Sequence, residues 1–191
     1  MPRRFVALPL DKHAWSPAPL LGQVVLITTV DQSGAVDVAP KSWVSMVSFT
    51  GPILGFGCRL RHRTYRNVAA TGEFVVNVPG SSSADDVWSI PEAGDRLTGL
   101  TLVPARTVAP PVIEECPAHL ECRHERTVEL PGGEVFVLGT VTAVAVDEAA
   151  VATEDIARRY AALDLFVFLE DGWHAALGRA TRVVPHPVPP A

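Results

Sequence analysis

The feature that most constrains the fold is that apolar residues come in short runs, each closed by proline or glycine. Pro (17) and Gly (14) are spread along all 191 residues. Most runs are rich in Val, Ile, Thr and Phe, which favour strands over helices. The longest unbroken runs, such as Val24–Ile27, are far shorter than the roughly 20 residues of a membrane helix. The pattern predicts a mainly β protein with no membrane span.

Four strands are expected in the first part of the chain. They are Gln23–Val30, a return strand that starts at Val36 and breaks at Pro40, Trp43–Phe49, and Ile53–Cys58. Tight turns such as Asp31–Gly34 join them, which is typical of an antiparallel meander.

The rest of the chain alternates strand patterns with three short helices. The helices are expected at Thr64–Thr71, Ser83–Trp88 and Thr153–Ala162, with Gly72 ending the first. The strands are expected at Glu73–Val78 and in two hairpins, Ala118–Glu129 with Glu134–Val146 and Leu165–Leu169 with Trp173–Leu177. Seven or eight strands with few helices favour a closed or nearly closed antiparallel β-barrel.

The length favours one domain over residues 1–191, because a domain takes roughly 150 residues. We expect an irregular N-terminal arm over 1–20 and a Pro-rich tail over 185–191. Residues 89–111 form a long segment in which Gly and Pro recur, and such segments are usually lids or interface arms.

Composition excludes several classes of protein. Hydrophobic residues make up 48% and charged residues 19%, which rules out a disordered chain. The net charge of −5 provides no basic field for nucleic acid or an anionic membrane. A secreted disulfide scaffold would have more cysteines, usually an even number, and this chain has three. We therefore expect a cytoplasmic protein.

The spacing Cys116-x-x-His119-x-x-Cys122 invites comparison with a zinc site. Three or four ligands would have to converge on one point. In a strand, His119 and Cys122 face opposite sides of the sheet, because side chains alternate. We therefore favour cysteines packed as small hydrophobic groups and expect no metal.

The stretch Cys58–Asn67 concentrates four arginines and His62 where a strand gives way to a helix. Helix N-termini offer unpaired N–H groups and partial positive charge. Arginines and Thr64 beside them would form an anion site, most naturally for a phosphate. The alternative is a solvated connector with Thr64 as an ordinary N-cap.

The stretch Lys41–Ser48 follows Pro40, which removes one donor from the strand ladder. Hydroxyls from Ser42 and Ser45 and the flat ring of Trp43 would suit a ligand, although a strand with one wet face remains the alternative. The two stretches are neighbours if their strands form a hairpin. A heteroaromatic ring that carries a phosphate would then fit between them, and FMN has that shape.

At this point the chain resembles the flavin reductase-like family, which has an FMN-binding split barrel, and within it the flavoredoxin-type branch. The resemblance runs from about Gln23 to Glu148. It rests on the ordered segments VVLITTVDQSGAVDVAPKSWVSMVSFTGPILGFGC, HRTYRNVAATGEFVVNVP, GLTLVPARTVAPPVI, CPAHLECR and VFVLGTVTAVAVDE.

The resemblance implies an antiparallel split barrel that forms a homodimer, with FMN at the subunit interface. By position, the flavin ring would be lined by Lys41, Ser42, Trp43, Val44 and Ser45. The phosphate would be bound by Arg63 and Thr64, with Cys58 and Arg59 at its edge.

One departure bears on the reaction. Many reductases of this family carry a Gly-Asp-His motif whose histidine meets the nicotinamide. The strand we align with it reads Gly139-Thr140-Val141, without a histidine. The resemblance therefore implies FMN binding more strongly than oxidation of NADH or NADPH.

We expect an FMN-dependent oxidoreductase that moves electrons from NAD(P)H or another donor to a partner monooxygenase, oxygen or a small substrate. Such chemistry belongs to the flavin and needs no side-chain nucleophile. His62 and His174 are the candidate proton donors, unless they are solvated surface histidines. The alternatives are a non-catalytic FMN electron carrier and a small-molecule-binding barrel without redox function.

Overall fold

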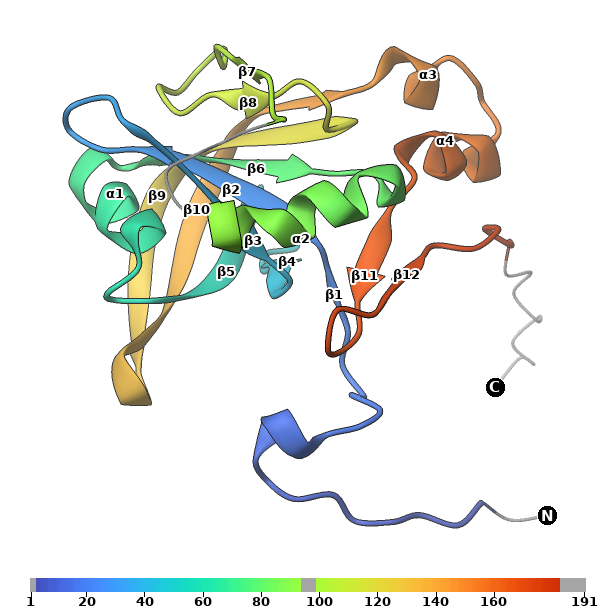
Figure 1. Ribbon diagram of the computed structural model, residues 1–191. Coiled ribbons are helices and arrows are strands. Elements are labelled where there is room, and N and C mark those ends of the chain that lie inside the picture. The colour runs from blue at the N-terminus through green and yellow to red at the C-terminus, as the bar shows by residue number, and fades with distance from the viewer. Residues whose placement is uncertain (1–2, 94–98, 183–191) are drawn as a thin grey trace, which may run out of the picture.

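The computed structural model describes residues 3–93 and 99–182 (Figure 1). The predicted tail at 185–191, and residues 94–98 of the predicted irregular segment, lie outside the described residues. The helices are α1 (Arg63–Thr71), α2 (Ala84–Ala93), α3 (Glu148–Val151) and α4 (Ile156–Leu163), with single 3-10 turns at Lys12–Ala14, Ser81–Ser83 and Pro131–Gly133. The strands are β1 (Gly22–Gln23), β2 (Val25–Val30), β3 (Val36–Lys41), β4 (Val44–Met46), β5 (Ile53–Arg59), β6 (Glu73–Val78), β7 (Leu102–Val103), β8 (Val112–Ile113), β9 (Ala118–Leu130), β10 (Glu134–Val146), β11 (Phe166–Phe168) and β12 (His174–Ala176).

Seven strands form one antiparallel sheet in the order β3-β2-β6-β9-β10-β5-β4. Its two edge strands are consecutive in the chain, since β3 ends at Lys41 and β4 begins at Val44. Three residue steps span at most about 11 Å, so the edges must lie close together. The sheet therefore curls into a barrel, as Figure 1 shows, and the predicted mainly β split-barrel fold is confirmed.

Two details of the predicted meander are wrong. Strand β3 does not break at Pro40, which pairs with Leu26 within the strand. An edge strand tolerates proline because one side of its ladder needs no N–H donor. Strands β3 and β4 are not neighbours in the ladder but lie at opposite edges of the sheet.

Several predicted boundaries also shift. The strand expected at Trp43–Phe49 shortens to β4, and the helix expected at Ser83–Trp88 continues to Ala93. The helix expected from Thr153 begins at Ile156, because the Asp155 carboxylate caps it by accepting from the N–H groups of Ala157 and Arg158. Gly72 ends α1 with a φ of 75°, as predicted.

The barrel interior is filled by the inward faces of the large sheet. Phe56 and Phe74 meet edge to face there, with ring centroids 5.3 Å apart. Gly139 makes this packing fit, because a Cβ there would overlap the Phe74 ring. A second apolar cluster lies between the outer face of β2 and β3, helix α2 and strand β11.

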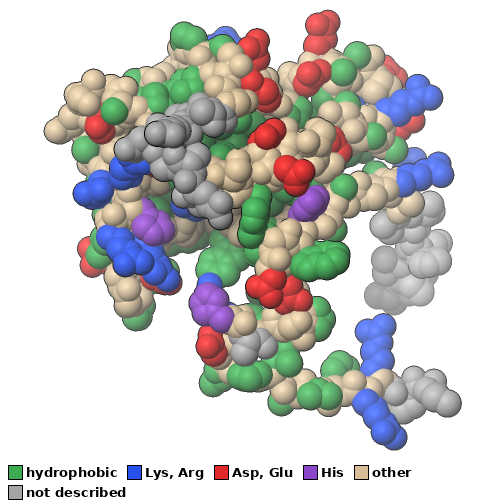
Figure 2. Space-filling model, viewed as in Figure 1, with side chains coloured by type: hydrophobic (Ala, Val, Ile, Leu, Met, Phe, Trp, Pro, Cys, Tyr) green, Lys and Arg blue, Asp and Glu red, His purple; other side chains and the backbone are tan. Residues whose placement is uncertain are grey.

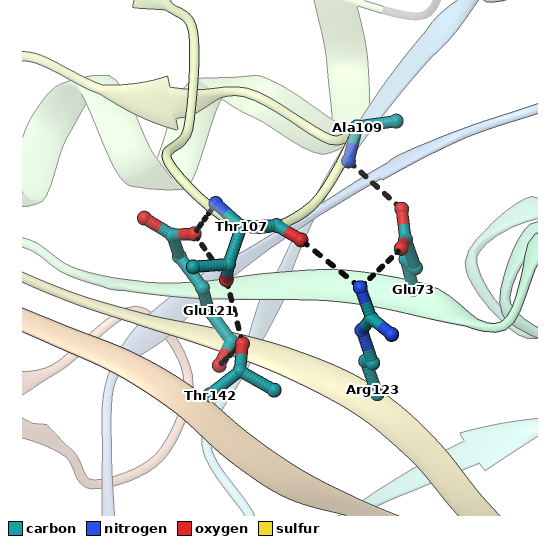
Figure 3. A network of polar contacts seen from close by, with 6 residues as sticks. All are labelled: Glu73, Thr107, Ala109, Glu121, Arg123 and Thr142. Carbon is teal, nitrogen blue, oxygen red and sulfur yellow. Dashed lines mark hydrogen bonds and ion pairs between the residues drawn. The ribbon is translucent and has the colours of Figure 1, made fainter.

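The segment before β8 is held to the sheet by polar contacts, some of them partly buried (Figure 3). The Glu121 carboxylate accepts from the N–H of Arg106 at 3.0 Å and from both the N–H and the hydroxyl of Thr107. Glu73 accepts from the N–H of Ala109 at 2.8 Å. This part of the predicted irregular segment is therefore fixed by two carboxylates.

Candidate functional site

The strongest site candidate is the link between the two edge strands, at Lys41, Ser42 and Trp43. These residues line a cavity of about 750 Å³. Lys41 and Ser42 also line a second cavity of about 390 Å³. Both volumes lie in the range of small-molecule sites. Of the expected ring-binding residues, these three therefore come together at cavities.

The backbone of this link is held from two sides. A Cβ on Gly22 would overlap the Ser42 carbonyl oxygen, so β1 can approach this closely only with glycine. On the other side, the Gly57 N–H donates to the Trp43 carbonyl oxygen at 3.2 Å. The Trp43 ring is 55% exposed, and the Lys12 ammonium lies 3.9 Å from its centroid.

The other two expected ring-binding residues lie elsewhere. Val44 packs against the barrel core, and the Ser45 hydroxyl donates to the Met46 carbonyl oxygen at 3.0 Å. Neither residue lines the two cavities described above. The strand alternation accounts for this, because residues after Trp43 point in turn to the core and to solvent.

The expected phosphate site lies at the start of α1, where Figure 2 shows Lys and Arg side chains gathered over α1 and the adjoining end of β5. The N-cap is His62, not Thr64, and it makes no side-chain cap hydrogen bond. Thr64 is buried, and its hydroxyl donates to Asp37 at 3.0 Å. Arg63 pairs with the same carboxylate at 3.2 Å.

The remaining members of this stretch are near one another. Arg59 lies 3.7 Å from Glu134 across the β5–β10 pair, and both side chains are half exposed. The Cys58 thiol is buried 3.9 Å from Nδ1 of His62. Partial burial, followed by the positive charge of Lys41, lowers the pKa of His62. The imidazole is therefore neutral near pH 7. Lys41, whose charge acts on His62, also lines the larger cavity.

The second candidate proton donor, His174, lies on β12 and is exposed. It lines the smaller cavity and meets the Phe166 ring edge to face, with centroids 5.5 Å apart. His62 and His174 therefore lie in different surroundings, one beside α1 and the other beside α2.

Some cavity residues were missed by sequence reasoning. Lys12 and Trp15 from the N-terminal arm line the larger cavity, and Trp88 from α2 lines the smaller one. Local patterns contain no sign of these contacts. Asp37 was also missed, although an acidic residue between Val36 and Val38 in a strand is a sign of a paired buried carboxylate.

The spacing considered for zinc is occupied by other contacts. Cys116 and Cys122 are buried, as predicted, and burial raises the pKa of each thiol to about 12. His119 lies 3.1 Å from the Asn77 side-chain oxygen. Among residues 3–93 and 99–182, no group of three or more metal-ligating side chains gathers. Within the same residues, no helix is long and apolar enough to cross a membrane.

Comparison with known proteins agrees with the fold. The fold is similar to nitrilotriacetate monooxygenase component B from Bacillus cereus, with a TM-score of 0.81 at 20% identity over 95% of this chain and 100% of that chain. It is also similar to flavoredoxin from Methanosarcina acetivorans, with a TM-score of 0.78 at 22% identity over 95% of both chains.

Sequence comparison adds a relative in Archaeoglobus fulgidus, which is 35% identical over 107 residues, or 53% of this chain and 60% of that protein. A relative in Halalkalibacterium halodurans is 31% identical over 62% of this chain and 64% of its own length. The chain thus spans less than two thirds of these relatives. The family model described as flavin reductase like domain matches residues 20–164. The chain belongs to the flavin reductase-like family.

Proposed function

We propose that the protein is an FMN-dependent oxidoreductase that binds the flavin ring in the larger cavity. The observation that carries the proposal is continuity between this cavity and the basic start of α1. The cavity reaches Gly57 on β5, and the next residues are Cys58 and Arg59. A planar ring beside Trp43 and Lys41 would therefore place its phosphate tail toward α1.

The phosphate would be held by charge and by backbone donors. Arg59 and Arg63 supply the charge, and Cys58 lies at the edge of the site. The first N–H groups of a helix lack partners within it, so the first turn of α1 adds donors. Because the Thr64 hydroxyl donates to Asp37, we assign Thr64 a contribution through its backbone N–H.

When bound, FMN would accept electrons from NADH, NADPH or another donor and pass them on. The protein's own residues would position the ring and exchange protons. Lys41 and Ser42 would line its polar edge, with Val44 and Ser45 supporting the strand behind them. We propose His174, which lines the smaller cavity, as a proton donor, whereas His62, which is neutral near pH 7, would accept a proton there.

We further propose a homodimer with the flavin at the interface. Apolar side chains on and after β4 are unusually exposed, including Met46 at 54% and Phe49 at 109%. The N-terminal arm, which Figure 1 shows extending away from the barrel, exposes Phe5 and Leu10 almost completely. A second copy that covers these surfaces would bury upwards of roughly 2,000 Å². Light scattering that gives a stable 20.4 kDa monomer at micromolar concentration would contradict the proposal.

The flavin proposal is tested by comparing FMN with riboflavin, which lacks the phosphate. A charge-assisted contact is worth about 1.5–3 kcal/mol, so Arg63→Ala should weaken FMN binding roughly ten- to hundredfold. Riboflavin affinity should change little. Arg158→Ala, which removes an arginine that pairs with Asp155 on α4, is the matched control. Equal losses for both ligands would show that Arg63 acts through its Asp37 pair and not through the phosphate.

The alternative function is a non-catalytic FMN electron carrier. The carrier is favoured by the sequence Gly139-Thr140-Val141, which stands in place of the Gly-Asp-His motif. Instead of a histidine that meets the nicotinamide, the chain has Thr140, whose hydroxyl donates to Glu125. Likeness to a monooxygenase component supports a partner oxygenase, and likeness to a flavoredoxin supports the carrier. Anaerobic mixing of FMN-loaded protein with NADH or NADPH separates them, because only the reductase bleaches the oxidised flavin band.

A further inference from the structure

The smaller cavity has walls that differ from those of the larger one. It lies between β3, α2 and the β11–β12 hairpin, and it shares Pro40, Lys41, Ser42 and Phe168 with the larger cavity. The two cavities are therefore adjacent chambers on either side of the link between the edge strands. A volume of about 390 Å³ is at the small end of the range for ligand sites.

Aromatic rings form one side of this chamber. The rings of Trp88 and Phe168 are stacked, with centroids 5.5 Å apart and planes at 16°. Trp88 nevertheless keeps 56% of its surface exposed. Gly172, with a φ of 83°, brings no side chain over it. A flat ligand would therefore find a preformed aromatic surface to stack on.

The smaller cavity has few polar side chains in its wall, and their charges balance. Lys41 and Asp85 carry opposite charges, which favours an uncharged ligand. Ser42 and His174 add hydrogen-bond donors at the wall. A carbonyl or nitro oxygen at the edge of a planar ring would match these donors.

We propose that the smaller cavity binds a small, uncharged planar aromatic compound that carries a hydrogen-bond-accepting oxygen, such as a naphthoquinone. The proposal rests on the proposed function in one respect, namely that the flavin occupies the adjacent larger chamber. The ligand would stack on Trp88 and direct its oxygen toward Ser42 and His174.

The test is calorimetric titration of the flavin-free protein with menadione, a bicyclic planar quinone. Camphor, a bicyclic ketone of similar size that is not flat, is the ligand control. Trp88→Leu should weaken menadione binding about tenfold, since it removes the stacking surface. Trp173→Leu changes an exposed tryptophan next to Gly172 that lines neither cavity, so it should leave binding unchanged.

A second titration separates this proposal from the flavin proposal. Menadione should bind the FMN-loaded protein with the same stoichiometry as the flavin-free protein. Competition between FMN and menadione would overturn the two-chamber arrangement. Equal binding of camphor and menadione, or equal effects of the two tryptophan variants, would overturn the proposed stacking of an aromatic ligand on Trp88. If FMN fails to bind at all while menadione binding depends on Trp88, the flavin proposal falls and the aromatic chamber stands.

Discussion

Glu121→Gln is the sharpest test of how the segment before β8 is held. One carboxylate oxygen accepts from the N–H of Arg106. The other accepts from the N–H and the hydroxyl of Thr107, as Figure 3 shows. A glutamine has one oxygen and one NH₂ group. Whichever way the amide turns, its NH₂ faces a backbone N–H, so one partly buried donor loses its acceptor.

The magnitude follows from these contacts. Hydrogen bonds to a charged group contribute about 1.5–3 kcal/mol, and a buried donor left unpaired costs about 1–3 kcal/mol. Since one of the two oxygens is kept, we expect a loss of about 2–4 kcal/mol in the free energy of unfolding. With a urea dependence of about 2 kcal/mol/M, the unfolding midpoint should fall by about 1–2 M.

The effect should also depend on pH. Burial raises the pKa of Glu121, but the hydrogen bonds from Thr107 and the backbone N–H groups outweigh it, so the pKa lies below the usual 4.5. A depressed folded-state pKa stabilises the protein above the unfolded pKa, and this contribution is lost as pH falls through the folded value. The difference between wild type and Glu121→Gln should be complete at pH 7 and shrink below about pH 4.5.

Urea unfolding at pH 7 and pH 4 measures both effects. Glu129→Gln, an exposed carboxylate on the same strand, is the control and should leave the free energy of unfolding within about 0.5 kcal/mol of wild type. Equal midpoints for the two variants would refute the reasoning, as would a difference that does not shrink at low pH.

Three further predictions concern the cavity and the core. Gly22→Ala should weaken FMN binding because its Cβ displaces the Ser42 carbonyl, whereas Gly178→Ala, with open space around it, should not; equal affinities would contradict this. Asn77→Ala should lower the melting temperature by about 6–12 °C in calorimetry, because Asn77 donates to the Leu26 carbonyl oxygen and accepts from the Ile113 N–H, and a loss of about 3 kcal/mol is expected. NAD(P)H oxidation should be slow, because Thr140 stands where the family's Gly-Asp-His motif is aligned. Without that histidine the nicotinamide is positioned loosely over the flavin, which lowers the rate of hydride transfer steeply. A turnover above roughly 10 s⁻¹ with a micromolar KM in a steady-state assay would contradict this.

Much of the fold could be predicted because its determinants are local. The hairpin around Pro131–Gly133 and that around Glu170–Gly172 appear as predicted, since turn residues separate strand-forming runs. Gly72 was identified as a helix end because the left-handed conformation there favours glycine. Strand pairing across the sheet was less accessible: the order of β3 and β4 depends on closure of the barrel and not on their separation in sequence.

The candidate site divides in the same way. The sequence alone pointed to Lys41–Ser45 and to the arginines around the start of α1, because residue types that bind a ring or a phosphate stand out locally. Tertiary structure decided what those groups contact. Curling of the sheet brings Asp37 onto the Thr64 hydroxyl, and it brings Lys12 and Trp88 to the cavity walls from distant parts of the chain. Such contacts join residues with no regular spacing, so only the folded chain determines them.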